Sequence, residues 1–228
     1  MKKALLLVAA GLMLLSGCNH IQTTLQCDVD PDEVFGQHYD AWDFQIWYAL
    51  NENDEAFRAI LSTMDIDSNV TILGYGLMVQ NADTAAVMAK AIEACSNYVD
   101  RDTNVYMPVW QDNVDNTSTL LFTYGFAAPD MEEPLLYGTE VELAQAQHTG
   151  VSGNELAIVF NREAAERWAQ ITHDGIGRNV VIMLGADREG RVLSAPRIMG
   201  EVTGGRCSVT GDFSDDETCA LAAILNNK

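Results

Sequence analysis

The sequence predicts an α+β protein made of two small units, each a sheet covered by helices. Three observations carry this prediction. Large apolar residues alternate at every second position in short segments, other apolar residues recur at helical spacing between those segments, and an acidic, proline-containing connector, AAPDMEEP over 127–134, separates two such series. With 228 residues the chain can form one large or two small cores. We expect one domain over 37–130 and a second over 131–228.

The chain begins with the pattern of a bacterial lipoprotein signal peptide. Two lysines at positions 2 and 3 precede an apolar run over 4–15, which is shorter than the roughly 20 residues that span a bilayer. The following letters, LSGC over 15–18, resemble the lipobox, in which the cysteine is acylated and becomes the first residue of the mature protein. We therefore expect removal of residues 1–17 and a lipid anchor on Cys18. The alternative is an ordinary cleaved signal peptide in which Cys18 has no special role.

The residue after this cysteine indicates where the protein is sorted. Asn19, in place of aspartate, resembles the pattern that directs lipoproteins to the outer membrane. We therefore expect a protein anchored in the bacterial envelope, facing the periplasm. No later apolar run reaches 18 residues, so no further membrane-spanning segment is expected.

The mature chain is strongly acidic. Loss of residues 1–17 removes two of the 13 basic residues and none of the 33 acidic ones, which leaves a formal charge of −22. Such a surface repels phosphate backbones and anionic lipid headgroups, so nucleic acid is not an expected partner. The acidity otherwise indicates no more than solubility.

The sequence contains five cysteines: Cys18, Cys27, Cys95, Cys207 and Cys219. If Cys18 carries lipid, an even number remains in an oxidising compartment, which predicts disulfides. Four cysteines allow three pairings, and sequence alone does not choose among them. We favour Cys27 with Cys95 and Cys207 with Cys219, because each pair then lies within one predicted unit. A metal site is not expected, since no pair has C-x₂-C spacing and no histidine cluster accompanies them.

The N-terminal unit is predicted from periodicity. Residues 18–36 are polar and are expected to be a tether. Alternating apolar residues from Trp42 to Leu50 predict a half-buried strand, and helical spacing follows over 51–64. A strand over 69–79 precedes a helix over 83–99, whose face contains Val87, Ala91 and Cys95. Strands over 104–110 and 118–127 complete an order that is consistent with a ferredoxin-like base.

The C-terminal unit carries clearer start and stop signals. A strand over 154–160 is followed by a helix that Asn161 can cap and that Gly175 and Gly177 end. Residues 179–198 predict two strands around a glycine-bearing loop. Ser214 and Glu217 form an S-x-x-E capping box, which predicts the start of a last helix.

Six segments between about 134 and 225 resemble, in order, the head of the first large periplasmic domain of SecD and SecDF, membrane proteins that assist protein export. They are PLLYGTEVELAQAQ, LAIVFNREAAERWAQIT, IGRNVVIML, RVLSAPRI, EVTGGRCSVTGDFSDDET and ALAAIL. The resemblance implies that the first segment forms a leucine-rich turn and an acidic helix. The chain departs from the family in the longer charged loop LGADREGR, in Trp168 where phenylalanine is usual, and in lacking the family's transmembrane helices.

The resemblance also implies a binding module, because the family's head is thought to hold an emerging, unfolded polypeptide. Two motifs match the family's S-A-P and T-G-G-R patterns, and their residues are the candidate polypeptide-binding positions: Ser194, Ala195, Pro196, Thr203, Gly204, Gly205 and Arg206. The structural alternative is that the glycines form a tight turn and that the proline lies at a strand edge.

No catalytic pattern is found. The sequence lacks a G-x-S-x-G elbow and a Walker loop, and GIGRNV lacks the third glycine of a dinucleotide fingerprint. DVDPDE and DIDSN lack the glycine and glutamate of an EF-hand. The histidines are scattered: His20, His38, His148 and His173. We therefore expect no catalytic residue, no cofactor and no metal.

Two functions are compatible with these observations. The first is a lipid-anchored holdase or export accessory that binds unfolded or extended polypeptide, because sheet edges and apolar grooves pair with many sequences. The second is a non-enzymatic adaptor that docks one folded envelope partner, since a fold does not determine a function.

Overall fold

The computed structural model describes residues 22–98, 105–113, 115–125, 133–150, 153–185 and 190–227. The predicted signal peptide, Cys18 and most of the predicted connector 127–134 lie outside these ranges. Within them, no helix combines the length and the apolar character that crossing a bilayer requires.

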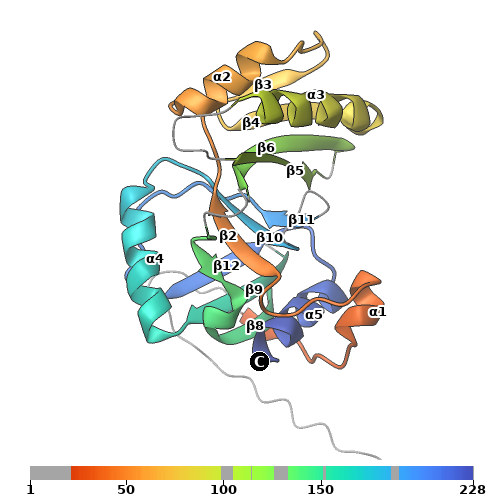
Figure 1. Ribbon diagram of the computed structural model, residues 1–228. Helices are drawn as coiled ribbons and strands as arrows, with labels where there is room; N and C mark the ends of the chain where they lie inside the picture. The colour runs from red at the N-terminus through yellow and green to blue at the C-terminus, as the bar shows by residue number, and fades with distance from the viewer. Residues whose placement is uncertain are drawn as a thin grey trace, which may run out of the picture.

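Three antiparallel sheets are stacked on one another (Figure 1). The upper sheet has the order β3 (Thr71–Leu73), β4 (Gly76–Gln80), β6 (Thr117–Gly125), β5 (Val105–Asp112). The middle sheet has the order β11 (Arg191–Ser194), β10 (Val180–Leu184), β2 (Phe44–Tyr48), β7 (Leu136–Tyr137). The lower sheet has the order β1 (Gln22–Thr24), β8 (Val141–Thr149), β9 (Gly153–Phe160), β12 (Arg206–Thr210). The predicted α+β class is confirmed.

The middle sheet is buried on both faces. All five residues of β10 are buried; Val180, Ile182 and Leu184 belong to the lower core, whereas Val181 and Met183 belong to the upper one. An uninterrupted apolar run such as VVIML is what a strand covered on both sides requires. The apolar run VVIML therefore indicates a strand that is covered on both faces.

The prediction of a half-buried strand around β2 was wrong. Phe44 and Ile46 face the lower core, Trp47 faces the upper core, and Gln45 is buried as well. Gln45 is satisfied because its Oε1 accepts a hydrogen bond of 3.0 Å from Trp47 Nε1. The strand is buried on both faces because the middle sheet, in which it pairs with β10 and β7, has one core on each side.

The predicted boundary between units also differs from the packing. β2 pairs with β10 and β7, and β1 pairs with β8, so residues 22–49 lie in the sheets formed by residues 133–227. Residues 50–125 form the inserted upper unit, with the order α2 (Glu55–Thr63), β3, β4, α3 (Thr84–Asn97), β5, β6. This order is not the ferredoxin-like β-α-β-β-α-β pattern, because β2 pairs outside the upper sheet.

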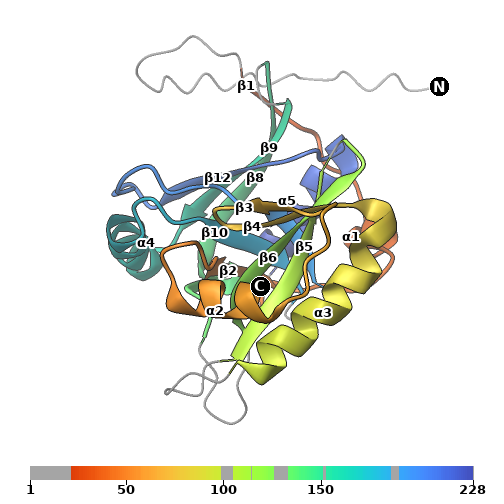
Figure 2. The same ribbon diagram turned by 90° about the horizontal axis from the view of Figure 1, so that it is seen from above.

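The two helices of the inserted unit cover the outer face of the upper sheet (Figure 2). The predicted face of α3 is confirmed, since Val87, Ala91 and Cys95 are buried against this sheet. From α2, Phe57 meets Phe122 of β6 edge-on at 6.1 Å between ring centroids. This third core lies between the helices and the outer face of the upper sheet. It is separate from the lower core and from the upper core, which contains Trp47 and Val181.

The segment PLLYGTEVELAQAQ does not form the turn and acidic helix that the family resemblance implied. It forms β7, one 3₁₀ turn η2 (Gly138–Glu140) and β8. Val141, Ala144 and Ala146 are buried, and the register shifts between Val141 and Leu143. Pairing of β8 with β9 buries this apolar set as a strand, and the register shift lets Val141 lie on the same face as Ala144 although the two are three positions apart.

Residues 22–36 are not the expected free tether. β1 pairs with β8, and α1 (Pro31–Phe35) begins at Asp30, whose side chain accepts a hydrogen bond of 3.0 Å from the amide of Asp32. Leu25, Val29 and Phe35 pack against the lower core. These three contacts are four and six positions apart, and the polar composition of the segment concealed them.

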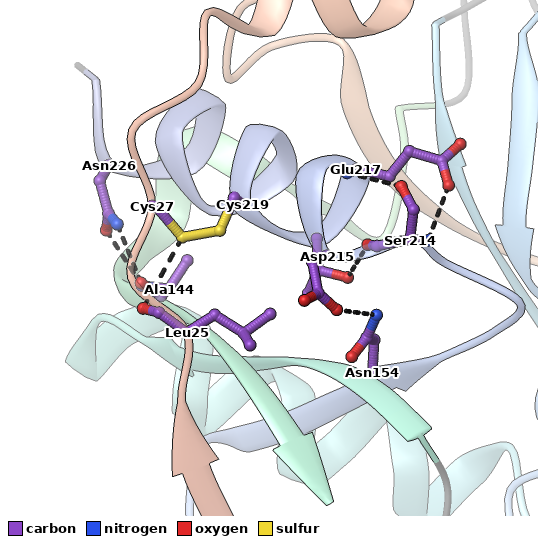
Figure 3. The surroundings of a disulfide bond; sticks show 10 residues. Leu25, Cys27, Ala144, Asn154, Ser214, Asp215, Glu217, Cys219 and Asn226 are labelled. Carbon is purple, nitrogen blue, oxygen red and sulfur yellow. Dashed lines mark hydrogen bonds between the residues drawn. A yellow bond between two sulfur atoms is a disulfide. The ribbon is translucent and has the colours of Figure 1, made fainter.

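The favoured disulfide pairing was also wrong. Cys27 is joined to Cys219 on α5 (Asp215–Asn226), with the two Cα atoms 5.2 Å apart (Figure 3). Cys95 is a buried thiol in the upper unit, and Cys207 is a thiol on β12 that packs against the lower core. Cys27 could not reach Cys95 because β1 and α1 pack with the lower unit and not with the inserted one.

Helix α4 (Arg162–Asp174) begins as predicted. The Asn161 side chain accepts a hydrogen bond of 2.9 Å from the amide of Ala164. Trp168 is 5% exposed and packs on Phe160, with ring centroids 5.7 Å apart, so this departure from the family is a core residue. The Ser214–Glu217 capping box at the start of α5 is confirmed as well.

The chain after β11 runs back along α4, from its C-terminal end to its N-terminal turn. A Cβ atom at Gly175 would meet Ile198, the amide of Val202 donates to Thr172 Oγ1 at 2.9 Å, and Gly205 lies against Ala165. The segment from Ile198 to Gly205 positions both candidate binding motifs, because residues 194–196 precede it and residues 203–206 end it.

Gly205 and Gly204 form a matched pair for mutation. Gly205 has a φ of +60°, and an added Cβ would lie 2.4 Å from Cβ of Ala165, whereas nothing lies within 4 Å of a Cβ at Gly204. We expect Gly205→Ala to lower the free energy of unfolding by about 1–3 kcal/mol. Gly204→Ala should change it by less than about 0.5 kcal/mol. Urea denaturation of both variants measures this, and equal effects would contradict the packing of the turn on α4.

A second prediction concerns pH. Burial by itself would raise the pKa of Glu217, but the Ser214 amide and the Arg191 guanidinium, 2.7 Å from Glu217 Oε1, lower this pKa below its ordinary value. A lowered pKa in the folded state means that the ionised carboxylate stabilises the fold above the unfolded-state pKa of about 4.3. This stabilisation is lost as pH falls through the lower, folded-state pKa.

Glu217→Gln should therefore reduce the loss of stability between about pH 5 and pH 3. Arg191→Met should reduce it too, because this variant removes the guanidinium that lowers the pKa. Thermal melts of the three proteins at several pH values provide the measurement. An unchanged slope in Glu217→Gln would show that the capping box does not contribute to acid sensitivity.

Candidate polypeptide-binding segments

Ser194, Ala195 and Pro196 lie at an edge of the middle sheet. Ser194 ends β11, Asn179 Nδ2 donates to the carbonyl of Ala195 at 2.8 Å, and the amide of Val180 donates to the carbonyl of Pro196 at 3.0 Å. Ser194 and Ala195 are half-buried and Pro196 is exposed. These contacts support the structural alternative, in which the proline lies where no ladder hydrogen bond is required.

The second motif, over 203–206, is a turn that leads into β12. The carbonyl of Gly205 accepts a hydrogen bond of 2.9 Å from the amide of Phe160, and Arg206 starts the pairing of β12 with β9. Gly205 is buried against α4, whereas Thr203, Gly204 and Arg206 are exposed. Gly205 is therefore explained by the turn, whereas nothing around Gly204 requires a glycine. Thr203, Gly204 and Arg206 stay available for contact.

The structure does not bring the two motifs together. One lies beside the residues that follow the C-terminal end of α4, and the other packs on the first turn of this helix at Ala165. Ala165 and Gly175 are ten residues apart, which corresponds to about 15 Å along a helix. The seven predicted residues consequently form two separate surfaces.

An exposed apolar pair that the sequence analysis missed lies on two paired segments, one of which carries Pro196. Ile176 is 56% exposed and Met199 is 83% exposed. Their segments are paired, since the amide of Gly177 donates to the carbonyl of Ile198 at 2.9 Å and the amide of Ile198 donates to the carbonyl of Arg178 at 2.8 Å. Each residue has a glycine as neighbour in the sequence, GIG and MG, and this was the available signal.

Arg178 anchors the segment that carries Ile176 to Tyr48 and Asp54. The guanidinium of Arg178 lies 4.6 Å from the centre of the Tyr48 ring, and its Nη2 lies 3.3 Å from Asp54 Oδ2. Tyr48 is held in turn, because its hydroxyl donates to the carbonyl of Ile171 at 2.6 Å. The apolar pair is therefore presented on a fixed support, which lowers the entropic cost of binding.

Two titratable groups near these segments have raised pKa values. Burial raises the pKa of Tyr48, and the charge of Asp174 adds to this effect while Arg178 opposes it. Burial likewise raises the pKa of the Cys207 thiol to about 12, with a further contribution from Glu155. Both groups are therefore protonated near neutral pH and are poor nucleophiles. In the described part of the chain, no cluster of three histidine, cysteine or acidic residues is arranged to hold a metal ion.

A cavity of about 120 Å³ lies in the inserted unit, between α3 and the segment that joins α2 to β3. Met64, Val70 and Val87 provide apolar walls, and Asp65 and Lys90 lie at it as well. The cavity is far from both candidate motifs in the fold, because it belongs to the upper unit and they belong to the middle and lower sheets.

Comparison with known proteins identifies the C-terminal part. The family model described as SecDF, P1 head subdomain, matches residues 127–227. The SecDF protein translocase subunit of Thermus thermophilus is 30% identical over 98 residues, which cover 43% of this chain and 13% of that protein. The SecD subunit of Acidaminococcus fermentans is 30% identical over 99 residues, which cover 43% of this chain and 23% of that protein. The match thus spans less than a quarter of these relatives.

Solved structures of SecDF are also similar. A crystal structure in a super-membrane-facing form has a TM-score of 0.40 and 16% identity, and covers 82% of this chain and 19% of that one. A second structure, of SecDF as a membrane component that enhances protein export, has a TM-score of 0.37 and 18% identity. The match covers 80% of this chain and 92% of that one. The family match and the curated relatives thus show that residues 127–227 of this chain are similar to the SecD/SecDF P1 head subdomain.

Proposed function

We propose that this protein is a lipid-anchored envelope protein that binds unfolded or extended polypeptide and assists protein export from the periplasmic side. The observation that carries the proposal is the match of residues 127–227 to the SecDF P1 head subdomain. The signal peptide and the lipobox cysteine at position 18 supply a membrane attachment that does not depend on transmembrane helices.

The polypeptide-binding surface that we propose contains Ile176, Met199 and Pro196. Exposed apolar side chains gain most from contact with the apolar residues of an unfolded chain, because such residues are buried once that chain has folded. The formal net charge of −20 of the full sequence disfavours nucleic acid as a competing ligand. Binding through side chains of this kind depends weakly on sequence, as an export accessory requires.

Replacement of the apolar pair should weaken this binding. We expect the double variant Ile176→Ser/Met199→Ser to raise the Kd for a carboxymethylated, permanently unfolded secretory protein by about tenfold. Ile72→Ser is the matched control, because Ile72 is 59% exposed but lies on β3 of the inserted unit. Fluorescence anisotropy with the labelled unfolded protein gives the Kd.

Two results would contradict the proposal. If wild-type protein binds neither this nor other unfolded chains and instead co-purifies with one folded envelope protein in fixed stoichiometry, the adaptor function replaces it. If Ile72→Ser weakens binding as much as the double variant does, polypeptide binding stands but the surface is wrong.

The anchor is tested separately in cells. Full-length protein should incorporate labelled fatty acid and sediment with membranes, and Cys18→Ser should lose both properties because the acylated thiol is absent. Cys207→Ser is the control, since this thiol is partly buried and carries no lipid in the proposal. Release of wild-type protein into the soluble fraction without a fatty-acid label would instead indicate an ordinary cleaved signal peptide.

A further inference from the structure

The outer edge of β8 is covered by two unrelated parts of the chain. β1 pairs with it in the register Gln22↔Thr149, Thr23↔His148 and Thr24↔Gln147, and the amide of Leu25 donates to the carbonyl of Ala146 at 2.9 Å. Further along, the Asn226 side chain takes the place of a strand residue (Figure 3). Its Oδ1 accepts from the amide of Ala144 at 3.0 Å and its Nδ2 donates to the carbonyl of Ala144 at 2.9 Å.

This arrangement shows which backbone groups of β8 point outward. Along a strand, alternate residues direct both their N–H and C=O groups to the same side. Ala144 and Ala146 bond outward, so the N–H and C=O groups of His148 lie on the same edge. The edge is thus a row of hydrogen-bonding positions that are all adapted to an extended backbone.

The cover that β1 provides is light. It is a three-residue strand, and the side chains of Thr23 and Thr24 are exposed. Its apolar contact comes from Leu25, which packs against the lower core. Strand pairing of this length is marginal in water unless something else holds it in place.

The Cys27–Cys219 disulfide supplies this hold. Cys27 follows Leu25 by two residues and is exposed, whereas Cys219 is buried on α5. Such a short link gives β1 a high effective concentration at the β8 edge. Opening of the disulfide leaves β1 held by three ladder positions, the Leu25–Ala146 hydrogen bond and the packing of Leu25, and joined to the packed residues Val29 and Phe35 by the chain alone.

We propose that the outer edge of β8 is an acceptor site for an extended polypeptide, that β1 is its occupant within the chain, and that reduction of Cys27–Cys219 exposes the site. The inference rests on the proposed function, because it names a second contact for the same class of ligand. Main-chain pairing accepts many sequences, and the core beneath Leu25 selects an apolar residue at that position.

The opening step needs a dithiol as reductant. A thiolate of the dithiol attacks the exposed Sγ of Cys27, the S–S bond breaks, and the Cys219 sulfur leaves and takes up a proton. The second thiol of the reductant then attacks the mixed disulfide and releases Cys27 as a thiol. The protein gains two electrons and two protons, and the dithiol is oxidised to a disulfide.

The test compares the oxidised protein with the double variant Cys27→Ser/Cys219→Ser, which lacks the disulfide without added reductant. We expect the variant to bind a carboxymethylated, unfolded secretory protein at least about fivefold more tightly in anisotropy titrations. Cys207→Ser is the control for loss of a thiol and should bind as wild type does. Hydrogen exchange should be faster at the amides of Leu25 and His148 in the variant, while circular dichroism verifies its fold.

Edge-specific variants separate this site from the Ile176 surface. Adding His148→Pro to the double variant removes an outward N–H from the edge of β8 and should abolish the gain in affinity. Adding His148→Ala removes the same side chain, including its contact of 2.9 Å between Nδ1 and Asn154 Oδ1, and should preserve the gain.

Each other outcome overturns a defined statement. Equal binding by oxidised protein and the double variant would sink the inference and leave the proposed function intact, whereas no binding by either would overturn the proposed function. A dimer of the double variant in light scattering would show that the edge takes β1 of a second copy instead. If the double variant does not fold, wild-type protein treated with dithiothreitol replaces it and is judged by the same titration.

Discussion

The antiparallel pairing of β2 with β10 is the interaction on which the rest of the structure depends. Five residue pairs, from Val180↔Tyr48 to Leu184↔Phe44, join a strand from the first quarter of the chain to one from the last. Both strands are apolar on both faces, so they need cover above and below, and the inserted unit and the lower sheet provide it. The head-like domain is therefore complete only with residues that precede the family match.

The same strand connects the units. After Tyr48 the chain leaves the middle sheet, since Ala49 forms a bridge with Thr123 and the amide of Leu50 donates to the carbonyl of Phe122 at 2.8 Å. Arg178 adds a second connection through Tyr48 and Asp54. Because the support of the apolar pair at Ile176 and Met199 includes this contact, the inserted unit contributes to holding the proposed binding surface in place.

The N-terminal residues relate the fold to the proposed anchor. With β1 paired, Gln22 is held four positions after Cys18, and four residues span at most about 14 Å. With the disulfide open and β1 released, the first residue packed on the lower core is Val29, and the limit rises to about 37 Å. The disulfide would then set both the access to the β8 edge and the reach of the protein from its membrane.

Local chemistry was sufficient to determine much of this protein from sequence. The Asn161 cap, the Ser214–Glu217 capping box and the buried face of α3 depend on residues within four positions of each other, so spacing alone predicts them. The family resemblance over the C-terminal part was equally readable, because six motifs occur in one order. Whether one face or both faces of a strand are buried depends on segments distant in sequence. For this reason the prediction of a half-buried strand at β2 was wrong.

The tertiary structure decided which residues distant in sequence contact each other. Cys27 and Cys219 are separated by 192 residues, and any of three pairings satisfied the spacing until the packing of β1 and α1 on the lower unit brought these two sulfurs together. Tertiary packing likewise decides three other features. They are the strand conformation of β8, the separation of the two candidate motifs along α4, and the exposure of Ile176 and Met199. A sequence specifies which residues prefer burial or extension, but the surface that finally covers them is created by chain segments that only the complete fold places next to each other.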